Sequence, residues 1–474
     1  MRIDGLADDE AATVERLLGT INDKRERNWL RSQYYDAKRR PKDAGLVLPP
    51  HLVNTLGAVL GWPAKAVDGR ANRARFQGLS YVKDEGVQRE LDTFMEDNYL
   101  IPEIQQGIIA SLEHSLSFLV ADRGEADGEP ESLLLVKDAL NATGEWNVRR
   151  RGLDNFLSVT DWWGNSETSN ARELAFHQPG KKVSYLRQET DGGHWHKISE
   201  SKGAPLDHVT VHPMVYRPRK GREYGSSCIS RPIMGITDMA VRTVVRAEVG
   251  AEFYSTPQRW LMGADEKAFG DKNPWQIIVG RIMALSDDED LTNPRAEVGQ
   301  FPQISMQPHM DQLRSLAQLF SGEASIPVSS LGISIDSNPT SADSYSASRE
   351  DIISDVETAL EASWRQAVER AVKDAMELRG VTMDDRVIAR FLDPRYTSKA
   401  AASDAFSKQV AAMPWLAETE VAVDMLGYDP AITAQLKAER QKASSAQTLN
   451  NIANMAAAAM KPATTGAPTQ NGNQ

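Results

Sequence analysis

The apolar residues change their spacing abruptly near residue 232, and no other feature constrains the fold of this chain as much. From Pro232 to Pro257 they recur at steps of three and four, which predicts a helix of about 24 residues with Pro232 in its first turn. The apolar stripe is suited to packing against another helix, either of the same chain or of another copy. The stripe comprises Ile233, Ile236, Ala240, Val244, Ala247, Ala251 and Tyr254, and the opposite face carries Asp238, Arg242, Arg246, Glu248 and Glu252.

Two different sequence textures precede this helix. Residues 1–131 contain helical patterns at 8–38, 51–60, 85–98 and 102–118. From residue 132 to about 215, short apolar or alternating runs are separated by Gly, Asn and Asp, which is typical of strands. One run, YLRQETDGGHWHKI, predicts a hairpin, because Asp191, Gly192 and Gly193 supply the positive φ angles that a tight turn needs. The sequence therefore predicts an α+β fold.

A small insertion and a second helix follow. Residues 257–308 are mostly extended, with two strand-like runs, QRWLMG and QIIVGRIMAL, and an acidic run at 287–290. A helix is predicted to begin near Met310, so helices flank the insertion on both sides.

The next stretch is polar and lacks cations. GISIDSNPTSADSYSASRE covers residues 332–350, and no Lys or Arg occurs from Gly322 to Ser348. A helix is predicted from about Ser341 to Leu378, on the order of 55 Å long. Residues 380–440 give one strand-like run, VIARFL, and then short helices, whereas the final 34 residues are expected to be disordered at their end.

Several classes of protein are disfavoured by what the sequence lacks. It contains no phosphate loop, no G-x-G-x-x-G, no H-E-x-x-H and no G-x-S-x-G, so no cofactor is expected. The single Cys228 leaves no intrachain disulfide and no cysteine metal cluster. A net charge of −12 argues against a protein that grips nucleic acid, although acidity alone mainly aids solubility. The N-terminus lacks a signal core, and no apolar run is long enough for a membrane span.

Two weak chemical motifs have simpler structural interpretations. His194 and His196 alternate on a predicted strand, but the pattern supplies no third metal ligand. The turn at Ser226, Ser227 and Cys228 could hold a nucleophile, and a soluble intracellular hydrolase using it is the alternative function. Pro232 directly behind this turn favours a structural role, as the entry to the helix.

Taken in order, these parts resemble the portal proteins of tailed double-stranded DNA bacteriophages, most closely the siphophage portals of actinobacteriophages. The resemblance covers nearly the whole chain. Its most specific pieces are the turn GSSCIS entering the helix, STPQRWLMG at its exit, IPVSSLG at 326–332 and FLDPRYTSKAAASDAFSKQV at 391–410.

The resemblance implies a portal fold with an α/β wing, a two-helix stem, a small β-containing clip, a long wing helix and a helical crown. The implied parts are the N-terminal wing at 1–231, the stem helices at 232–256 and 309–322, the clip at 257–308, the tunnel loop region at 323–341, the long wing helix at 342–379, the crown at 380–440 and the C-terminal tail at 441–474.

The expected functional residues follow from these parts. The tunnel loop would face DNA, and its lack of cations suits a channel that must not hold the phosphates, although a plain flexible linker predicts the same composition. The expected tunnel-loop residues are Ile333, Ser334, Ile335, Asp336, Ser337 and Asn338. The residues expected to pack between the stems of neighbouring copies are Ile236, Asp238, Arg242, Val244, Arg246 and Glu248. The residues expected to bind partners on the clip are Trp260, Trp275, Asp287, Asp288 and Glu289.

The resemblance also implies the partners and the location. The chain would assemble with itself into a cyclic homo-oligomer, twelve copies in the virion, at one capsid vertex, after assembly in the host cytoplasm. It would bind the large terminase subunit, the head–tail connector, and the capsid and scaffold proteins, while double-stranded DNA passes through. A hydrolase and a nucleic-acid binding module are the competing hypotheses.

Overall fold

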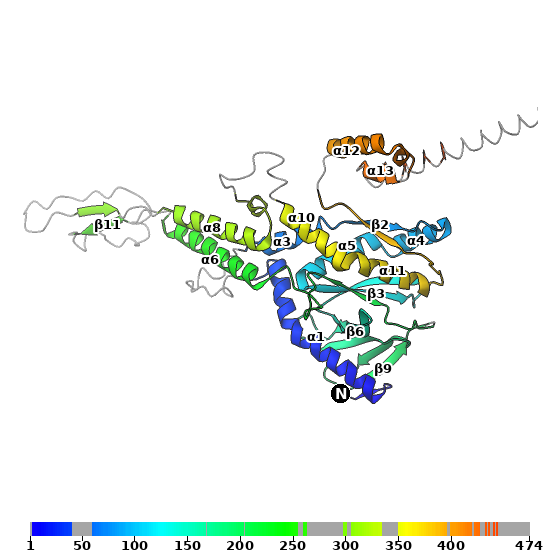
Figure 1. Cartoon of the computed structure of the whole chain (residues 1–474). Coiled ribbons are helices and arrows are strands. Elements are labelled where there is room, and N and C mark those ends of the chain that lie inside the picture. The colour runs from blue at the N-terminus through cyan, green and yellow to red at the C-terminus, as the bar shows by residue number, and fades with distance from the viewer. Residues whose placement is uncertain are drawn as a thin grey trace, which may run out of the picture. The chain divides into compact units, whose positions relative to one another are not determined.

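The computed structural model describes most of the chain and divides it into two compact units, Met1–Pro394 and Arg395–Gln474 (Figure 1). The described residues are 2–39, 59–254 without 167 and 203, 259–262, 297–300, 305–333, 349–395, 399–419, 421–426 and several between 432 and 443. Both helices and sheets are present, so the α+β prediction is confirmed. Among the described residues, no helix combines the length and the apolar character that a membrane crossing requires.

The first unit begins with a long helix on a sheet. Helix α1 (Asp8–Tyr35) buries Val14, Leu17 and Ile21, as its spacing predicts, and Glu10 accepts a hydrogen bond from the Ala7 backbone at its start. These side chains pack against a six-stranded sheet of order β1-β9-β8-β7-β6-β5. Its strands are β1 (Ile3–Asp4), β5 (Ala142–Asn147), β6 (Gly152–Trp162), β7 (Ala171–His177), β8 (Ser184–Gln188) and β9 (Trp195–Glu200).

The predicted hairpin lies in this sheet. Strands β8 and β9 pair antiparallel, and Gly192 in the turn between them has φ +72°. The hairpin prediction is therefore confirmed, although Asp191 and Gly193 do not have the positive φ that was expected of them.

A second, three-stranded sheet has the order β10-β3-β4, formed by β3 (Leu116–Arg123), β4 (Ser132–Asp138) and β10 (Val211–Val215). The helix predicted at 102–118 is wrong at its end: α5 (Leu100–His114) stops where Ser115 takes φ +87°. The apolar run that follows is a strand buried on both faces, a pattern that periodicity cannot distinguish from a buried helix. Helix α4 (Glu85–Asp97) agrees with the prediction at 85–98.

The long helix after the polar stretch crosses the three-stranded sheet (Figure 1). It comprises α10 (Glu350–Ala359), a π-helical turn (Leu360–Trp364) and α11 (Arg365–Leu378). The described helix thus begins at Glu350, whereas the prediction began near Ser341; residues 341–348 lie outside the described part.

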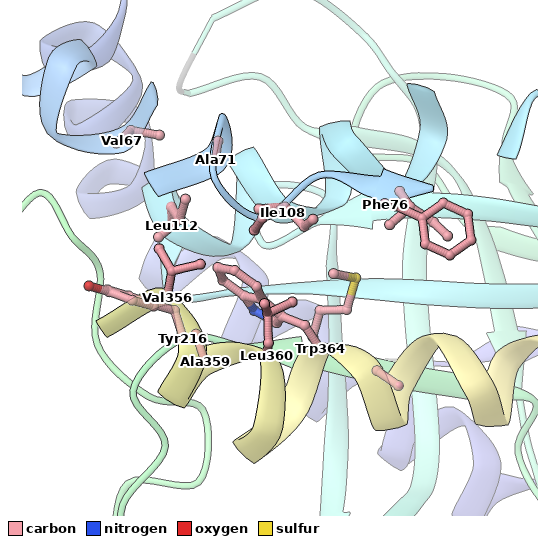
Figure 2. Close-up of a cluster of buried hydrophobic side chains, with 14 of the residues drawn as sticks. Val67, Ala71, Phe76, Ile108, Leu112, Tyr216, Val356, Ala359, Leu360 and Trp364 are labelled. Carbon is pink, nitrogen blue, oxygen red and sulfur yellow. The ribbon is translucent and has the colours of Figure 1, made fainter. Parts of the chain in front are cut away.

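Trp364 is the centre of the main core. It is fully buried, its indole N–H donates to the Ser111 hydroxyl at 3.0 Å, and its ring stacks on that of Tyr216 with centroids 6.3 Å apart. Figure 2 shows Ile108, Leu112, Val356 and Leu360 around it. Helix α3 (Trp62–Ala71) contributes Val67 and Ala71 to the same core, which therefore joins distant parts of the chain.

Two helices lie side by side and lead to a small strand pair (Figure 1). They are α6 (Arg231–Tyr254), which confirms the helix predicted at 232–255, and α8 (Gln307–Ala324), which begins slightly before the predicted Met310. Strands β11 (Arg259–Met262) and β12 (Glu297–Gln300) pair antiparallel between them. The run QRWLMG is thus a strand as predicted, and QIIVGRIMAL lies outside the described residues.

The predicted strand VIARFL is also present, as β13 (Ile388–Phe391). It pairs with β2 (Phe76–Ser80), and its Ala389 is fully buried in the main core. Residues 380–394 therefore lie in the first unit, although the sequence assigned them to the crown. The second unit contains α12 (Lys399–Ala412), a 3₁₀ turn (Pro414–Glu418) and α13 (Val421–Met425).

Candidate interface and channel-facing elements

The two helices on either side of the polar stretch without Lys or Arg contact one buried arginine. This residue is Arg70 of α3, whose side chain is 2% exposed. Its Nε donates to the Asp355 carboxylate at 2.7 Å, its Nη1 to the Ala66 carbonyl at 2.9 Å and its Nη2 to the Ala324 carbonyl at 2.8 Å. Ala324 ends α8 before the stretch, and Asp355 lies in α10 after it. Arg70 thus joins the two elements that border the stretch.

Asp355 has two further partners. The Tyr216 hydroxyl donates to it at 2.5 Å, and Arg217 donates to both of its oxygens at 2.9 and 3.0 Å. Burial would raise the pKa of Asp355, but Arg70, Tyr216 and Arg217 outweigh it and hold this pKa below its ordinary value. The carboxylate is therefore charged at neutral pH.

The predicted tunnel-loop residues fall almost entirely outside the described part of the chain. Ser334, Ile335, Asp336, Ser337 and Asn338 lie in the range 334–348 that the structure does not describe. Ile333 is described, and its half-buried side chain packs against the main core directly after the 3₁₀ turn Val328–Leu331.

The residues predicted for packing between stems have different environments on α6. Ile236 is buried in the core of its own chain, and Asp238 accepts a hydrogen bond from the Tyr34 hydroxyl at 2.8 Å. Arg242 and Val244 are half-buried, whereas Arg246 and Glu248 are exposed.

The buried row of α6 differs in part from the predicted stripe. Thr237, Val241 and Val245 are buried along with Ile233 and Ala240, and α6 lies in contact with α8. The sequence did not show whether the partner of this helix belongs to the same chain or to another copy. For the buried face of α6, the partner helix belongs to the same chain.

The predicted clip residues are hardly described. Trp260 lies in β11, where its backbone is paired with Gly299. Trp275, Asp287, Asp288 and Glu289 lie outside the described residues.

The turn at Ser226–Cys228 has a structural role. A Cβ on Gly225, which has φ +64°, would lie 2.0 Å from the Tyr216 carbonyl oxygen, so only glycine fits there. The Ser227 hydroxyl accepts a hydrogen bond from the Ile229 backbone at 2.9 Å and donates to the Glu113 carbonyl. Burial raises the pKa of the Cys228 thiol, which opposes formation of a thiolate nucleophile.

These contacts offer no support for the hydrolase alternative. The described residues also contain no group of three His, Cys, Asp or Glu side chains that could hold a metal ion.

One feature was missed by the sequence reasoning: a cavity of about 1510 Å³ between α1 and the turn that precedes α6. Arg27 and Arg31 reach it from α1, and Arg222 reaches it from the turn. The spacing of Arg27 and Arg31, four residues apart on a predicted helix, is a signal that could have pointed to a basic stripe. The cations that line it are Arg16, Lys24, Arg27, Arg31, Arg39, Arg222 and Arg231, and the acids are Asp23, Glu26, Glu145 and Glu223.

Known proteins are similar to this chain over most of its length. The portal protein of Mycobacterium phage L5 is 23% identical over 415 residues, which cover 85% of this chain and 82% of the relative. The portal protein of Mycobacterium phage D29 is 24% identical over 414 residues, which cover 84% of this chain and 82% of the relative. No family model matches the chain.

Among solved structures, chains from gene transfer agent (GTA) particles match this chain with low TM-scores. The neck of the native GTA particle, computed with C12 symmetry, matches with a TM-score of 0.40 at 14% identity, over 78% of this chain and 90% of that chain. The neck of the empty particle, computed with C6 symmetry, matches with a TM-score of 0.42 at 13% identity and the same coverage.

Proposed function

This chain belongs to the portal proteins of tailed phages, and we propose that its copies close into a ring whose channel carries double-stranded DNA into and out of the capsid. A portal protein is a structural component of the virion at one capsid vertex and not an enzyme. The similarity to two mycobacteriophage portal proteins over about 85% of the chain carries this proposal.

The parts of the portal fold are assigned as follows. The stem is α6 with α8, the clip is the insertion 257–308 that contains β11 and β12, and the wing is 1–231 with the long helix 342–379. The tunnel loop region is 323–341, and the tail is 441–474. We place the crown at 395–440 and assign 380–394 to the wing, because β13 pairs with β2 in the first unit.

The channel-facing segment of this proposal is the tunnel loop, Ile333 to Asn338. Duplex DNA carries one phosphate charge per about 1.7 Å of its axis, so cations at a constriction would retain it. From Gly322 to Ser348 the sequence offers Glu323, Asp336 and Asp343 and no Lys or Arg. A loop of this composition would let the duplex slide, and Arg70 joins the two helices that border it, α8 and α10.

The ring would contain twelve copies, with Arg242, Val244, Arg246 and Glu248 of α6 facing a neighbouring stem. Each exposed ion pair contributes only about 0.2–1 kcal/mol, so burial repeated at every interface must dominate the assembly. Asp238 is left out of this set, because Tyr34 of its own chain already donates to it.

The remaining partners are expected at the ends of the ring. The sequence offers no phosphate loop, so a separate motor, the large terminase subunit, would supply ATP hydrolysis and dock on the clip. Trp260, Trp275, Asp287, Asp288 and Glu289 are the proposed contacts, since aromatic residues are favoured in interface cores. The head–tail connector and the scaffold and capsid proteins are the other proposed partners of the ring.

Electron microscopy of the purified chain tests the proposal. We expect closed rings with a central channel, and labelled copies at a single vertex of the virion. Monomers or dimers alone at high protein concentration would contradict it. Affinity for duplex DNA that falls steeply with salt, in the absence of rings, would instead favour a nucleic-acid binding module.

A further inference from the structure

A group of three arginines converges on the cavity between α1 and the turn before α6. Arg31 is half-buried, and its Nη1 donates to the Asn28 side chain and to the His114 carbonyl, both at 3.3 Å. Its Nε is buried and has no hydrogen-bond partner among the described residues. Arg27 and Arg222 are exposed and line the same cavity. Three positively charged side chains thus line one cavity, and one of them, Arg31, is already partly removed from water.

The nearby carboxylate does not balance this group. Burial, together with the charges of Arg27 and Arg222, lowers the pKa of Arg31 to about 10, and Glu113 acts in the opposite direction. Glu113 is already engaged: the Ser32 hydroxyl donates to it at 2.5 Å, and His114 Nε2 lies 3.1 Å away. The carboxylate that acts on Arg31 is therefore already held by two other side chains.

A second, independent observation also indicates a missing partner. The side chain of His114 is 3% exposed and lines the cavity, yet its Nδ1 is buried and has no partner among the described residues. Leaving a buried polar atom without a partner is unfavourable, because the atom has lost its hydrogen bonds to water. The cavity wall therefore presents two buried nitrogens, Arg31 Nε and His114 Nδ1, that lack a hydrogen-bond partner there.

We propose that this cavity receives a carboxylate-bearing segment of a second copy of this chain. The proposal rests on the ring proposed above, in which a head-to-tail contact joins one face of each copy to a different face of the next. The chain carries 66 acidic and 54 basic residues, so the neighbour has acidic side chains to offer.

The charge pattern of the cavity favours a protein segment over DNA. Four acids, Asp23, Glu26, Glu145 and Glu223, line it among the cations. They would repel a phosphate backbone, whereas a protein segment can match both signs. Of these acids, Glu145 already pairs with Arg16.

Zero-length crosslinking tests the contact directly. The variant Arg27→Lys/Arg222→Lys keeps both charges and places amines in the cavity, so a carbodiimide can join them to a carboxylate in salt-bridge contact. Rings are assembled from a mixture of isotopically light and heavy full-length chains. We expect mixed-isotope crosslinks at position 27 or 222. Rings that give none, or only crosslinks within one chain, overturn the proposal.

Charge reversal tests how much the proposed contact at this cavity contributes to ring assembly. We expect Arg27→Glu/Arg222→Glu to raise the protein concentration required for ring formation at least tenfold, as measured by mass photometry. The control Arg150→Glu/Lys182→Glu reverses two exposed cations outside the cavity lining and should leave assembly unchanged. Circular dichroism shows whether each variant is folded.

The outcomes separate the two proposals. If the wild-type chain forms no rings, the proposed function fails and this inference fails with it. If wild type and the charge-reversal variant form rings equally well, only the inference fails. Loss of duplex DNA binding by that variant without any effect on assembly would assign the cavity to nucleic acid and also overturn it.

Discussion

Replacing Arg70 by methionine should destabilise the first unit strongly, although the new side chain is apolar and of similar length. The substitution removes the donor to three acceptors, the Asp355 carboxylate and the carbonyls of Ala66 and Ala324. Breaking a buried ion pair by removing one partner costs about 3–5 kcal/mol. Arg217 still contacts Asp355, which reduces this loss, so we expect about 3 kcal/mol.

A matched control is available in the same cluster. Arg217 donates to the same carboxylate, but its side chain is 52% exposed. Replacing it by methionine should cost about 1 kcal/mol or less, because solvent screens an exposed pair. Comparing the two variants therefore shows how much of the stability loss comes from the burial of the ion pair and how much from the ion pair alone.

Urea unfolding of the full-length chain, with hydrogen exchange of the α8 and α10 amides, measures both variants. The Arg70 variant should lose protection at the end of α8 and the start of α10 together, since Arg70 joins these helices. Equal losses in the two variants, or a cost below about 1 kcal/mol for Arg70→Met, would refute the reasoning.

The same cluster gives a pH dependence. The folded pKa of Asp355 lies below its ordinary value, so its contribution is complete above the unfolded pKa, about 4. That contribution is lost as the pH falls through the folded value. Asp355→Asn should flatten this acid limb of stability against pH.

Three other outcomes are expected. The hydrogen bond to Asp374 is the chief cause that raises the pKa of His208 to about 9. The protonated His208 therefore stabilises the fold fully below about pH 6.5, and this contribution is lost as the pH rises through about 9. His208→Gln should remove that alkaline loss of stability, as measured by thermal melts. Asp336→Lys with Ser337→Lys should leave ring assembly intact but impair DNA packaging, and normal packaging would mean that the loop does not face the duplex. Gly225→Ala should cost more than about 2 kcal/mol in urea unfolding, because its φ is positive and a backbone oxygen occupies the Cβ position; a neutral effect would contradict the turn geometry.

Periodicity predicted the elements whose burial is one-sided. Helix α1 and the hairpin β8–β9 follow their patterns closely, because one face of each meets the core and the other meets water. It failed at residues 116–118, since a strand buried on both faces has no period to detect. Spacing also cannot show which chain supplies a partner, and α6 proved to pack on α8 of its own chain.

The candidate interface was much less predictable. Arg70 lies in a short helix, and nothing in its neighbours signals that Ala324 and Asp355, more than 250 residues away, will meet it. The arginines at 27 and 222 are likewise brought together only by the tertiary fold. Such contacts depend on topology, which one sequence without a structure does not specify.

The position of Arg70 restricts how α8 can move against α10. A shift of α8 against α10 would pull the Ala324 carbonyl or the Asp355 carboxylate away from one buried guanidinium, and each loss leaves a polar group without its partner. The end of α8 and the start of α10 therefore move as one body. Leu331 extends this body, because its side chain is buried in the same core as Trp364. The half-buried side chain of Ile333 also packs against this core, so the constraint reaches the last described residue before position 334.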